Sequence, residues 1–145
     1  DYPVQVARLY QIGVVAAIFA GSMSRAREIL DRVFSIYIRR RDCRDGTGRC
    51  ISCGRPITFT TCDAGHYIPR THTATRWNEL NCHSQCIICN RLKHGNLAAY
   101  RAALVQKYGL PAVEELERSK HSVFKMSRSE MSDKINYYKR LIRNV

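Results

Sequence analysis

The sequence predicts an α+β fold, in which a small strand–strand–helix unit is pinned by a zinc ion and flanked by helices. Two Cys-x-x-Cys pairs, Cys50/Cys53 and Cys86/Cys89, enclose a segment that carries a histidine. Before the first pair, apolar residues recur at three- and four-residue steps, which indicates an amphipathic helix. After the second pair, helix start and stop signals follow one another along the chain. Together these observations place a small metal-bound core between helices.

We divide the chain into four segments. Residues 1–22 hold one acidic and one basic residue and end in Gly-Ser before Met23, so we interpret them as tag or vector sequence. A native amphipathic or partner-binding helix is the alternative. Residues 23–49 form an N-terminal basic helix and turn, residues 50–96 the zinc-stabilised core, and residues 97–145 the C-terminal helical region.

The N-terminal helix is expected to run from Ser24 to about Asp42, before a glycine-containing turn. Its other face carries arginines, so the helix can bury one stripe and present a basic ridge. The residues of the apolar stripe are Ala26, Ile29, Leu30, Val33, Phe34, Tyr37 and Ile38.

Two short strands are expected between residues 50 and 70. The first contains Ile57 and Phe59, and the second covers residues 66–68 before Pro69 ends it. Residues 71–85 show no clear periodicity, so we expect a loop there. A short helix is then expected to begin within the second cysteine pair and to carry Asn90, Lys93 and His94.

Three further helices follow the core. Asn96 can cap a helix over residues 97–108. Pro111 fits the first turn of the next helix. Ser127 and Glu130 form a Ser-x-x-Glu capping box, which predicts that a last helix begins there.

Cysteine spacing indicates a structural metal. Four thiolates in two Cys-x-x-Cys pairs complete a tetrahedral zinc site with no open position for chemistry. His83 is close enough in sequence to the second pair to be an alternative ligand. The total of seven cysteines is odd, which favours a reducing compartment over a disulfide framework. We interpret Cys43, Cys62 and Cys82 as free apolar side chains.

Charge indicates a polyanionic partner. The chain has 24 Lys and Arg against 12 Asp and Glu, for a net charge of +12, and nucleic acid is the simplest partner. A solubilising basic surface is the alternative. No apolar run is long enough to cross a bilayer, so we expect a cytoplasmic protein without a membrane partner.

From Cys50 to Lys93 the chain resembles the zinc-containing HNH, or ββα-metal, nucleases. Over most of residues 24–145 it resembles the NinG (Rap) recombination proteins of lambdoid phages, which act on branched DNA. The matching stretches are Cys-Ile-Ser-Cys-Gly at 50–54, Asp-Ala-Gly-His at 63–66, Ala-Thr-Arg-Trp at 74–77, Asn-Cys-His-Ser-Gln-Cys at 81–86 and Cys-Asn-Arg at 89–91. The resemblance implies the cytoplasm of a bacterial host.

The HNH pattern implies three residue roles. His66 would be the general base that activates a water, because a neutral imidazole can accept a proton near pH 7. Asn81 would hold the loop so that His66 is correctly oriented. Asn90 would bind a catalytic Mg²⁺ or Mn²⁺, which stabilises the phosphorane and the leaving 3′ oxygen.

The chain departs from this pattern before the histidine. Many HNH enzymes have an acidic metal ligand there, whereas this sequence has Gly65. Asp63 is one candidate for the second ligand. His94 is the other, because it lies four residues after Asn90 and would share a helix face with it. We rank Asn90 first among the candidate metal ligands.

The resemblance implies a metal-dependent, structure-specific endonuclease that cuts branched recombination intermediates, namely Holliday junctions and D-loops. Two alternatives remain open: a non-catalytic, zinc-stabilised DNA-binding accessory of recombination, and an HNH nuclease that cuts linear duplex DNA. Resolving a four-way junction takes two nicks, which favours a homodimer. The expected phosphate contacts are Arg39, Arg40, Arg41, Arg70, Arg76, Arg91 and Lys93, because backbone contacts position a protein on DNA.

Overall fold

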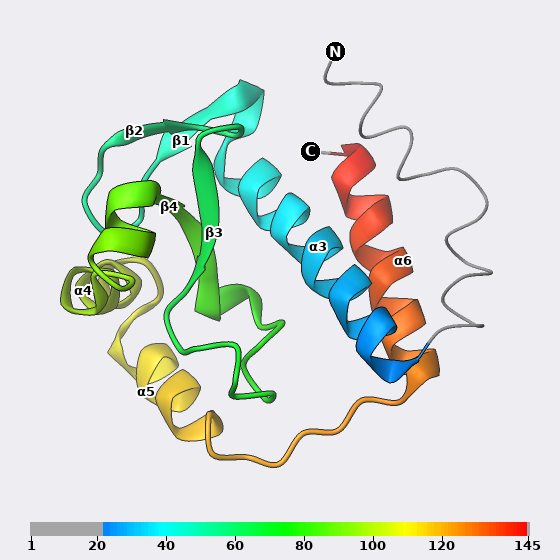
Figure 1. Ribbon diagram of the computed structural model, residues 1–145. Coiled ribbons are helices and arrows are strands. Elements are labelled where there is room, and N and C mark those ends of the chain that lie inside the picture. The colour runs from blue at the N-terminus through cyan, green and yellow to red at the C-terminus, as the bar shows by residue number, and fades with distance from the viewer. Residues whose placement is uncertain (1–21, 145) are drawn as a thin grey trace.

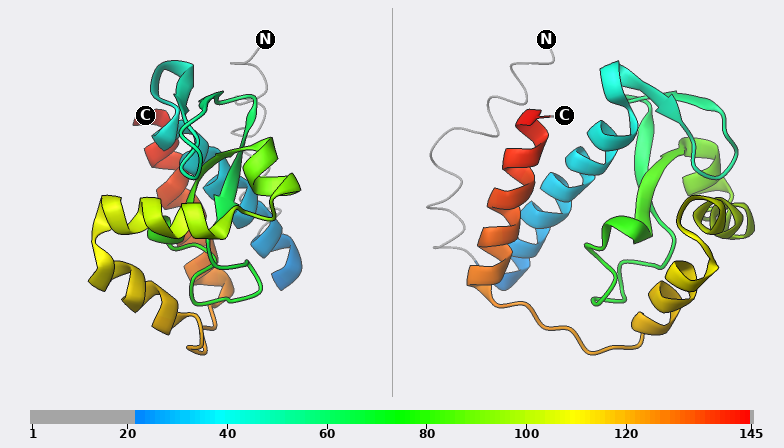
Figure 2. Two further views of the ribbon diagram at one scale, coloured as in Figure 1. Left: turned by 90° about the vertical axis from the view of Figure 1, so that its left-hand side faces the viewer. Right: turned by 180° about the vertical axis from the view of Figure 1, so that it is seen from behind.

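The computed structural model describes residues 22–144. Two long helices, α3 (Met23–Asp42) and α6 (Arg128–Asn144), lie side by side and run in the same direction (Figure 1). The β3–β4 hairpin lies between α3 on one side and α4 on the other, as two further views confirm (Figure 2). Between residues 22 and 144, no helix has both the length and the apolar character needed to span a bilayer. With its helices and two small antiparallel sheets, the described chain is α+β, as predicted.

Helix α3 confirms the periodicity seen in the sequence. It begins after Ser22, whose Oγ accepts a hydrogen bond from the backbone N–H of Arg25 at 3.3 Å, as an N-cap residue does. The predicted stripe is buried except for Ile29, which is partly exposed. The other residues of the segment interpreted as a tag, 1–21, lie outside the described part of the chain.

Helix α6 begins with the predicted capping box. The Glu130 carboxylate accepts the backbone N–H of Ser127 at 2.7 Å, and Ser127 Oγ accepts that of Glu130 at 3.2 Å. The helix then buries Met131, Ile135 and Tyr138 against α3 in the main hydrophobic core. This core forms one wall behind the β3–β4 hairpin.

Two antiparallel hairpins form the sheet structure. Strand β1 (Thr47–Arg49) pairs with β2 (Pro56–Thr58), and β3 (Cys62–His66) pairs with β4 (Cys82–Cys86). Short 3-10 turns precede β1 and β4: η1 (Arg44–Gly46) and η2 (Glu79–Asn81). In the β3–β4 register, His66 lies opposite Cys82.

The predicted strand positions need correction. The loop expected over residues 71–85 is wrong at its end, because residues 82–86 form β4. All five residues of β4 are buried, and a strand covered on both faces lacks the alternation that reveals strands in a sequence. The strand expected at 66–68 instead ends at His66, whereas buried Ile57 lies in β2 as expected.

The later helices follow the predicted order. A single π-turn, η3 (Ile88–Leu92), succeeds β4, and α4 (Leu97–Tyr108) and α5 (Leu110–Ser119) follow. Pro111 lies in the first turn of α5 as predicted. Asn96 precedes α4, but its side chain does not cap the helix. Because η3 ends at Leu92, the expectation that His94 shares a helix face with Asn90 is wrong.

Candidate functional site

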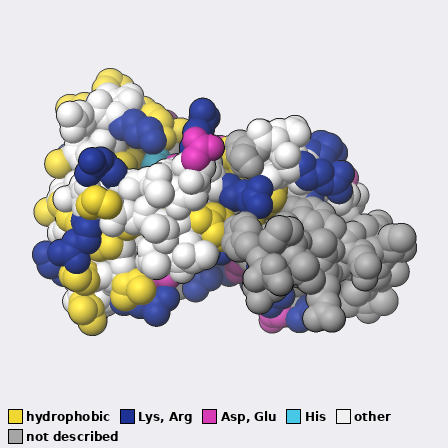
Figure 3. Space-filling view, turned by 90° about the horizontal axis from the view of Figure 1, so that it is seen from above, with side chains coloured by type: hydrophobic (Ala, Val, Ile, Leu, Met, Phe, Trp, Pro, Cys, Tyr) yellow, Lys and Arg dark blue, Asp and Glu magenta, His cyan; other side chains and the backbone are white. Residues whose placement is uncertain are grey.

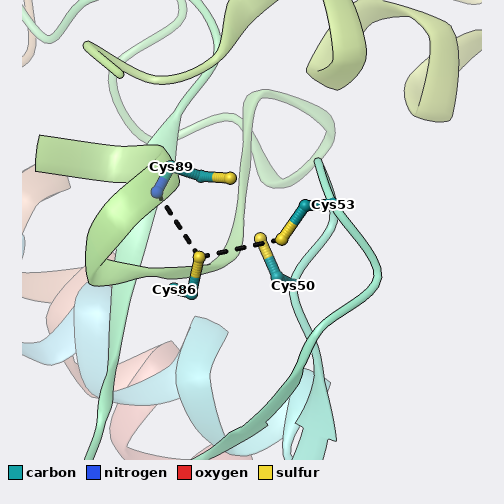
Figure 4. A group of neighbouring side chains, drawn as sticks. All are labelled: Cys50, Cys53, Cys86 and Cys89. Carbon is teal, nitrogen blue, oxygen red and sulfur yellow. Dashed lines mark hydrogen bonds between the residues drawn. The ribbon is translucent and has the colours of Figure 1, made fainter. Parts of the chain in front are cut away.

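The four paired cysteines form one cluster that can hold a metal ion such as zinc. Their Sγ atoms all lie within 4.8 Å of one another, and the side chains point toward a common centre (Figure 4). Cys53 Sγ and Cys86 Sγ are 3.8 Å apart. Four sulfurs at about 2.3 Å from a tetrahedral zinc are about 3.8 Å apart. The cluster therefore fits a closed thiolate site, and it joins the β1–β2 connection to the end of β4.

Backbone and side-chain N–H groups surround these sulfurs. Burial raises the pKa of the Cys50 thiol, but hydrogen bonds from backbone N–H groups outweigh it and lower that pKa to about 7. The backbone N–H of Cys89 approaches Cys86 Sγ at 3.4 Å. The Asn96 amide donates to Cys89 Sγ at 3.4 Å. These donors favour the thiolate form that binds a metal.

A cleft of about 680 Å³ lies next to this cluster, between α3, β3 and η3. It brings together four residues predicted for chemistry, although they come from separate parts of the chain. Three arginines that were expected to contact phosphate also line it. The lining residues with predicted roles are Asp63, His66, Asn90, His94, Arg39, Arg70 and Arg91.

His66, at the end of β3, has a defined tautomer. Its Nε2 lies 2.8 Å from the Arg76 carbonyl oxygen. A carbonyl only accepts hydrogen bonds, so Nε2 carries the proton and Nδ1 is the unprotonated nitrogen. Cys82 Sγ lies 3.8 Å from Nδ1. Burial lowers the pKa of His66, with partial opposition from the Arg76 carbonyl, so the imidazole is neutral at pH 7.

Asp31 of α3 holds the segment that binds His66. Its carboxylate accepts hydrogen bonds from Arg76 Nε and from Trp77 Nε1, each at 2.9 Å. The Arg76 carbonyl is thereby fixed beside the imidazole. The sequence analysis missed Asp31, because nothing in its local pattern relates it to a loop 45 residues away.

Asn81 closes the loop that follows His66. The side chain is fully buried. Its Oδ1 accepts the backbone N–H of Ile68 at 2.7 Å, and its Nδ2 donates to the carbonyls of Ile68 and Thr75 at 2.9 and 3.0 Å. The amide thus satisfies three backbone groups across the loop and fixes its path.

Asp63 and Asn90 meet in the cleft. Asn90 Nδ2 donates to the Asp63 carboxylate at 2.9 Å, and the Arg91 guanidinium donates to both of its oxygens at 2.8 Å. The hydrogen bonds from Arg91 hold the pKa of Asp63 below its usual value. An ionised carboxylate and an amide oxygen are suitable ligands for a hard divalent cation. In this arrangement the guanidinium supplies the positive charge next to Asp63.

Position 65 has no space for a side chain, which explains why it is glycine. A Cβ at this position would lie 2.0 Å from Oε1 of Gln85. Gln85 is fully buried, and its Nε2 donates to Ser52 Oγ and to the Gly95 carbonyl, both at 2.7 Å. The Gln85 side chain therefore connects the first cysteine pair to the turn after η3 and occupies the space beside Gly65. This residue was missed by the sequence analysis.

The arginines and the lysine expected to bind phosphate differ in their exposure and in their partners. Arg41 and Arg76 have side chains only 18% and 17% exposed, and each is paired with an aspartate. We therefore assign them to the internal structure. Arg70 and Lys93 are exposed. Arg39 lines the cleft and donates to the Phe59 carbonyl, and Arg40 donates to that of Ile142.

His83 is not a ligand of the cysteine cluster. It is buried between two tyrosines: Nδ1 lies 3.3 Å from the Tyr100 hydroxyl and Nε2 lies 2.8 Å from the Tyr108 hydroxyl. Tyr100 donates its own proton to the Gly65 carbonyl at 2.9 Å. This chain of hydrogen bonds supports β3 from the side opposite α3.

Burial lowers the pKa of His83 to about 3, and this predicts acid sensitivity. Below pH 6.5 the unfolded chain binds a proton at this position and the folded chain does not, so stability falls. Between pH 7 and pH 5 the free energy of unfolding should decrease by about 2 kcal/mol from this residue. Urea unfolding at both pH values measures the change. In His83→Gln the free energy of unfolding should lose this part of its pH dependence, whereas the exposed control His121→Gln should keep it. The same pH dependence in His83→Gln as in wild type would contradict the assignment.

Comparison with known proteins connects this arrangement to one family. The model of the bacteriophage lambda NinG protein family matches residues 21–145. The ninG proteins of Escherichia phage lambda and Salmonella phage P22 are 49% and 48% identical over 84 residues, which are 56% of this chain and 38% of each relative. The match thus spans less than half the length of these relatives.

A CRISPR-associated endonuclease Cas9 of Corynebacterium diphtheriae is 29% identical over 86 residues, which are 59% of this chain and 8% of that protein. No solved structure matches the chain. The family model, in contrast, covers all of the described residues. The chain therefore belongs to the family of the bacteriophage lambda NinG protein.

Proposed function

We propose that the chain is a metal-dependent endonuclease of the HNH type that cuts branched DNA. In this proposal β3, β4 and η3 are the ββα-metal unit, and the cysteine cluster holds a structural zinc. The observation that carries the proposal is the cleft, because neutral His66, Asp63 and Asn90 all line it. Arginines at its edge supply the positive charge that a phosphodiester backbone requires.

His66 is the proposed general base. Nε2 is held by the Arg76 carbonyl at 2.8 Å, so Nδ1 is the nitrogen that accepts the proton of the attacking water. Asn81 is a positioning residue, because its three hydrogen bonds fix the loop between His66 and β4. Asp31 acts in the same way through Arg76.

Asp63 and Asn90 are the proposed ligands of the catalytic Mg²⁺ or Mn²⁺, and His94 at the edge of the cleft is the further candidate. When bound, the cation stabilises charge on the phosphorane and on the leaving 3′ oxygen. Arg91 is exposed on its outer side, so it can release Asp63 and turn to a DNA phosphate. Gly65 replaces the acidic residue that many HNH enzymes have at this position, because Gln85 fills the space beside it.

The proposal for branched DNA rests on resemblance to the NinG proteins and predicts a preference that can be measured. A labelled four-way junction should be nicked with added Mg²⁺ or Mn²⁺, and the separate duplex arms should be nicked at least about tenfold more slowly. Sedimentation of the complex would report whether two copies bind. Equal nicking of the junction and of its arms would contradict branch specificity and favour an enzyme for linear duplex DNA.

A non-catalytic DNA-binding accessory is the second candidate. It is favoured by the ion pair between Asp63 and Arg91, which occupies the carboxylate that a catalytic cation would need. This candidate predicts tight junction binding with no nicking at any divalent cation concentration. The same junction assay therefore separates the two functions.

A further inference from the structure

Four large aliphatic side chains lie exposed on η3, just before it and at the start of α4. We call them the aliphatic ridge. Leu92 is 73% exposed. The members and their exposed fractions are Ile87 at 45%, Ile88 at 36%, Leu92 at 73% and Leu97 at 47%.

The ridge adjoins the candidate cleft through its neighbours in the chain, although its own four residues do not line the cleft. Asn90 and Arg91, which line the cleft, lie between Ile88 and Leu92 in the same π-turn. On the other side, Leu97 Cδ2 lies 3.0 Å from the position that a Cβ on Gly95 would take, and Gly95 lines the cleft too. A nucleic-acid strand that leaves the cleft across η3 would reach these side chains.

The surroundings of the ridge are basic. Residues 80–113 contain no Asp or Glu, and their Lys and Arg residues are Arg91, Lys93, Arg101 and Lys107. Two of these cations are paired with carboxylates from other segments, Arg91 with Asp63 and Arg101 with Glu117. In a space-filling view from above, apolar and basic side chains lie interspersed on the left half of the molecule (Figure 3). Aliphatic side chains can contact nucleobases, and the cations near them can contact the phosphates of the same strand. A protein partner with an apolar patch offers no such match in charge.

We propose that the aliphatic ridge is the surface that detects the branch, with Leu92 inserted at the unstacked base step. This inference rests on the proposed function and assigns its specificity. Apolar side chains inserted between base steps must first unstack them, which costs a few kcal/mol in a regular duplex. At a branch point stacking is already interrupted, so insertion is much easier there. The ridge would thus favour junctions without reading any base sequence.

The test measures base unstacking separately from cleavage. A four-way junction with 2-aminopurine at the branch is titrated with zinc-loaded wild-type protein, without added divalent cation. Fluorescence should rise with wild type and with Leu92→Met, and should fall to less than half of that rise with Leu92→Ala. The ratio of junction affinity to duplex affinity should drop about tenfold in Leu92→Ala. Leu110→Ala, which changes an exposed leucine of α5, should match wild type in both measurements.

Each other outcome has a defined meaning. An unchanged affinity ratio and fluorescence in Leu92→Ala would overturn the assignment. If Leu92→Ala changed only the sedimentation mass of the free protein, the ridge would be a contact between two copies and the assignment would again fail. A fluorescence rise that depends on Leu92 in a protein that never nicks DNA would support the ridge while contradicting the proposed nuclease. If Leu92→Ala nicked junctions in preference to duplex as strongly as wild type does, the result would support the proposed nuclease and contradict the assignment of the ridge.

Discussion

Cys86→Ser is expected to unfold the core of the protein. A structural zinc contributes on the order of 10 kcal/mol in small zinc domains, which is comparable to the whole stability of a domain of this size. The four Sγ atoms connect segments that are more than 30 residues apart, and the hydrophobic cluster around them is small and is itself built largely of these cysteines. Thermal unfolding followed by circular dichroism, with zinc content measured on the same sample, should show loss of both the metal and the folded state.

The control for this prediction is Cys43→Ser. Cys43 is buried next to Cys62 but lies outside the cluster. The same chemical change there should cost only about 1–3 kcal/mol for a buried hydroxyl, and the protein should keep one zinc per chain. Near-native thermal stability after the metal is removed with a chelator would contradict a structural role for the cluster.

His66→Ala is expected to reduce nicking of junctions by at least about 100-fold, because general base catalysis contributes roughly 10²- to 10⁴-fold. DNA affinity should stay close to that of wild type, since the arginines of the cleft are unchanged. The pH profile follows from burial, which lowers the pKa of His66. Activity of the wild type should therefore be constant near pH 7 and fall only below the ordinary histidine pKa of about 6.5.

His121→Ala is the matched control, because His121 is exposed and lies outside the cleft. It should leave the rate and the pH profile unchanged. Single-turnover nicking at saturating protein separates the chemical step from binding. A rate for His66→Ala within a factor of two of wild type would remove His66 from the mechanism.

The parts of the fold that the sequence predicts are those with local signals. The stripe on α3 follows helical periodicity, and Ser127 with Glu130 starts α6 through contacts within one turn. The cysteine cluster follows from spacing, because a Cys-x-x-Cys turn presents two thiolates to one ion. These features depend on residues that are close together in the chain.

Strand β4 and the supports of the candidate site depend on distant residues. The five residues of β4 are covered on both faces by helices, so the segment carries no period of two. Asp31 and Gln85 act through contacts with loops that are 10 to 46 residues away. Gly65 departs from the HNH pattern, and only the packing of Gln85 against it accounts for this. Patterns within a short stretch of sequence do not reveal contacts between residues this far apart in the chain.

The most direct test is nicking of a four-way junction by zinc-loaded wild type and by His66→Ala, each with and without added Mn²⁺. We expect strand breaks only with wild type and only with the cation, leaving 3′-hydroxyl ends. Breaks that appear without an added cation, or at equal rates in the two proteins, would contradict a cleft in which His66 activates water beside a metal ion.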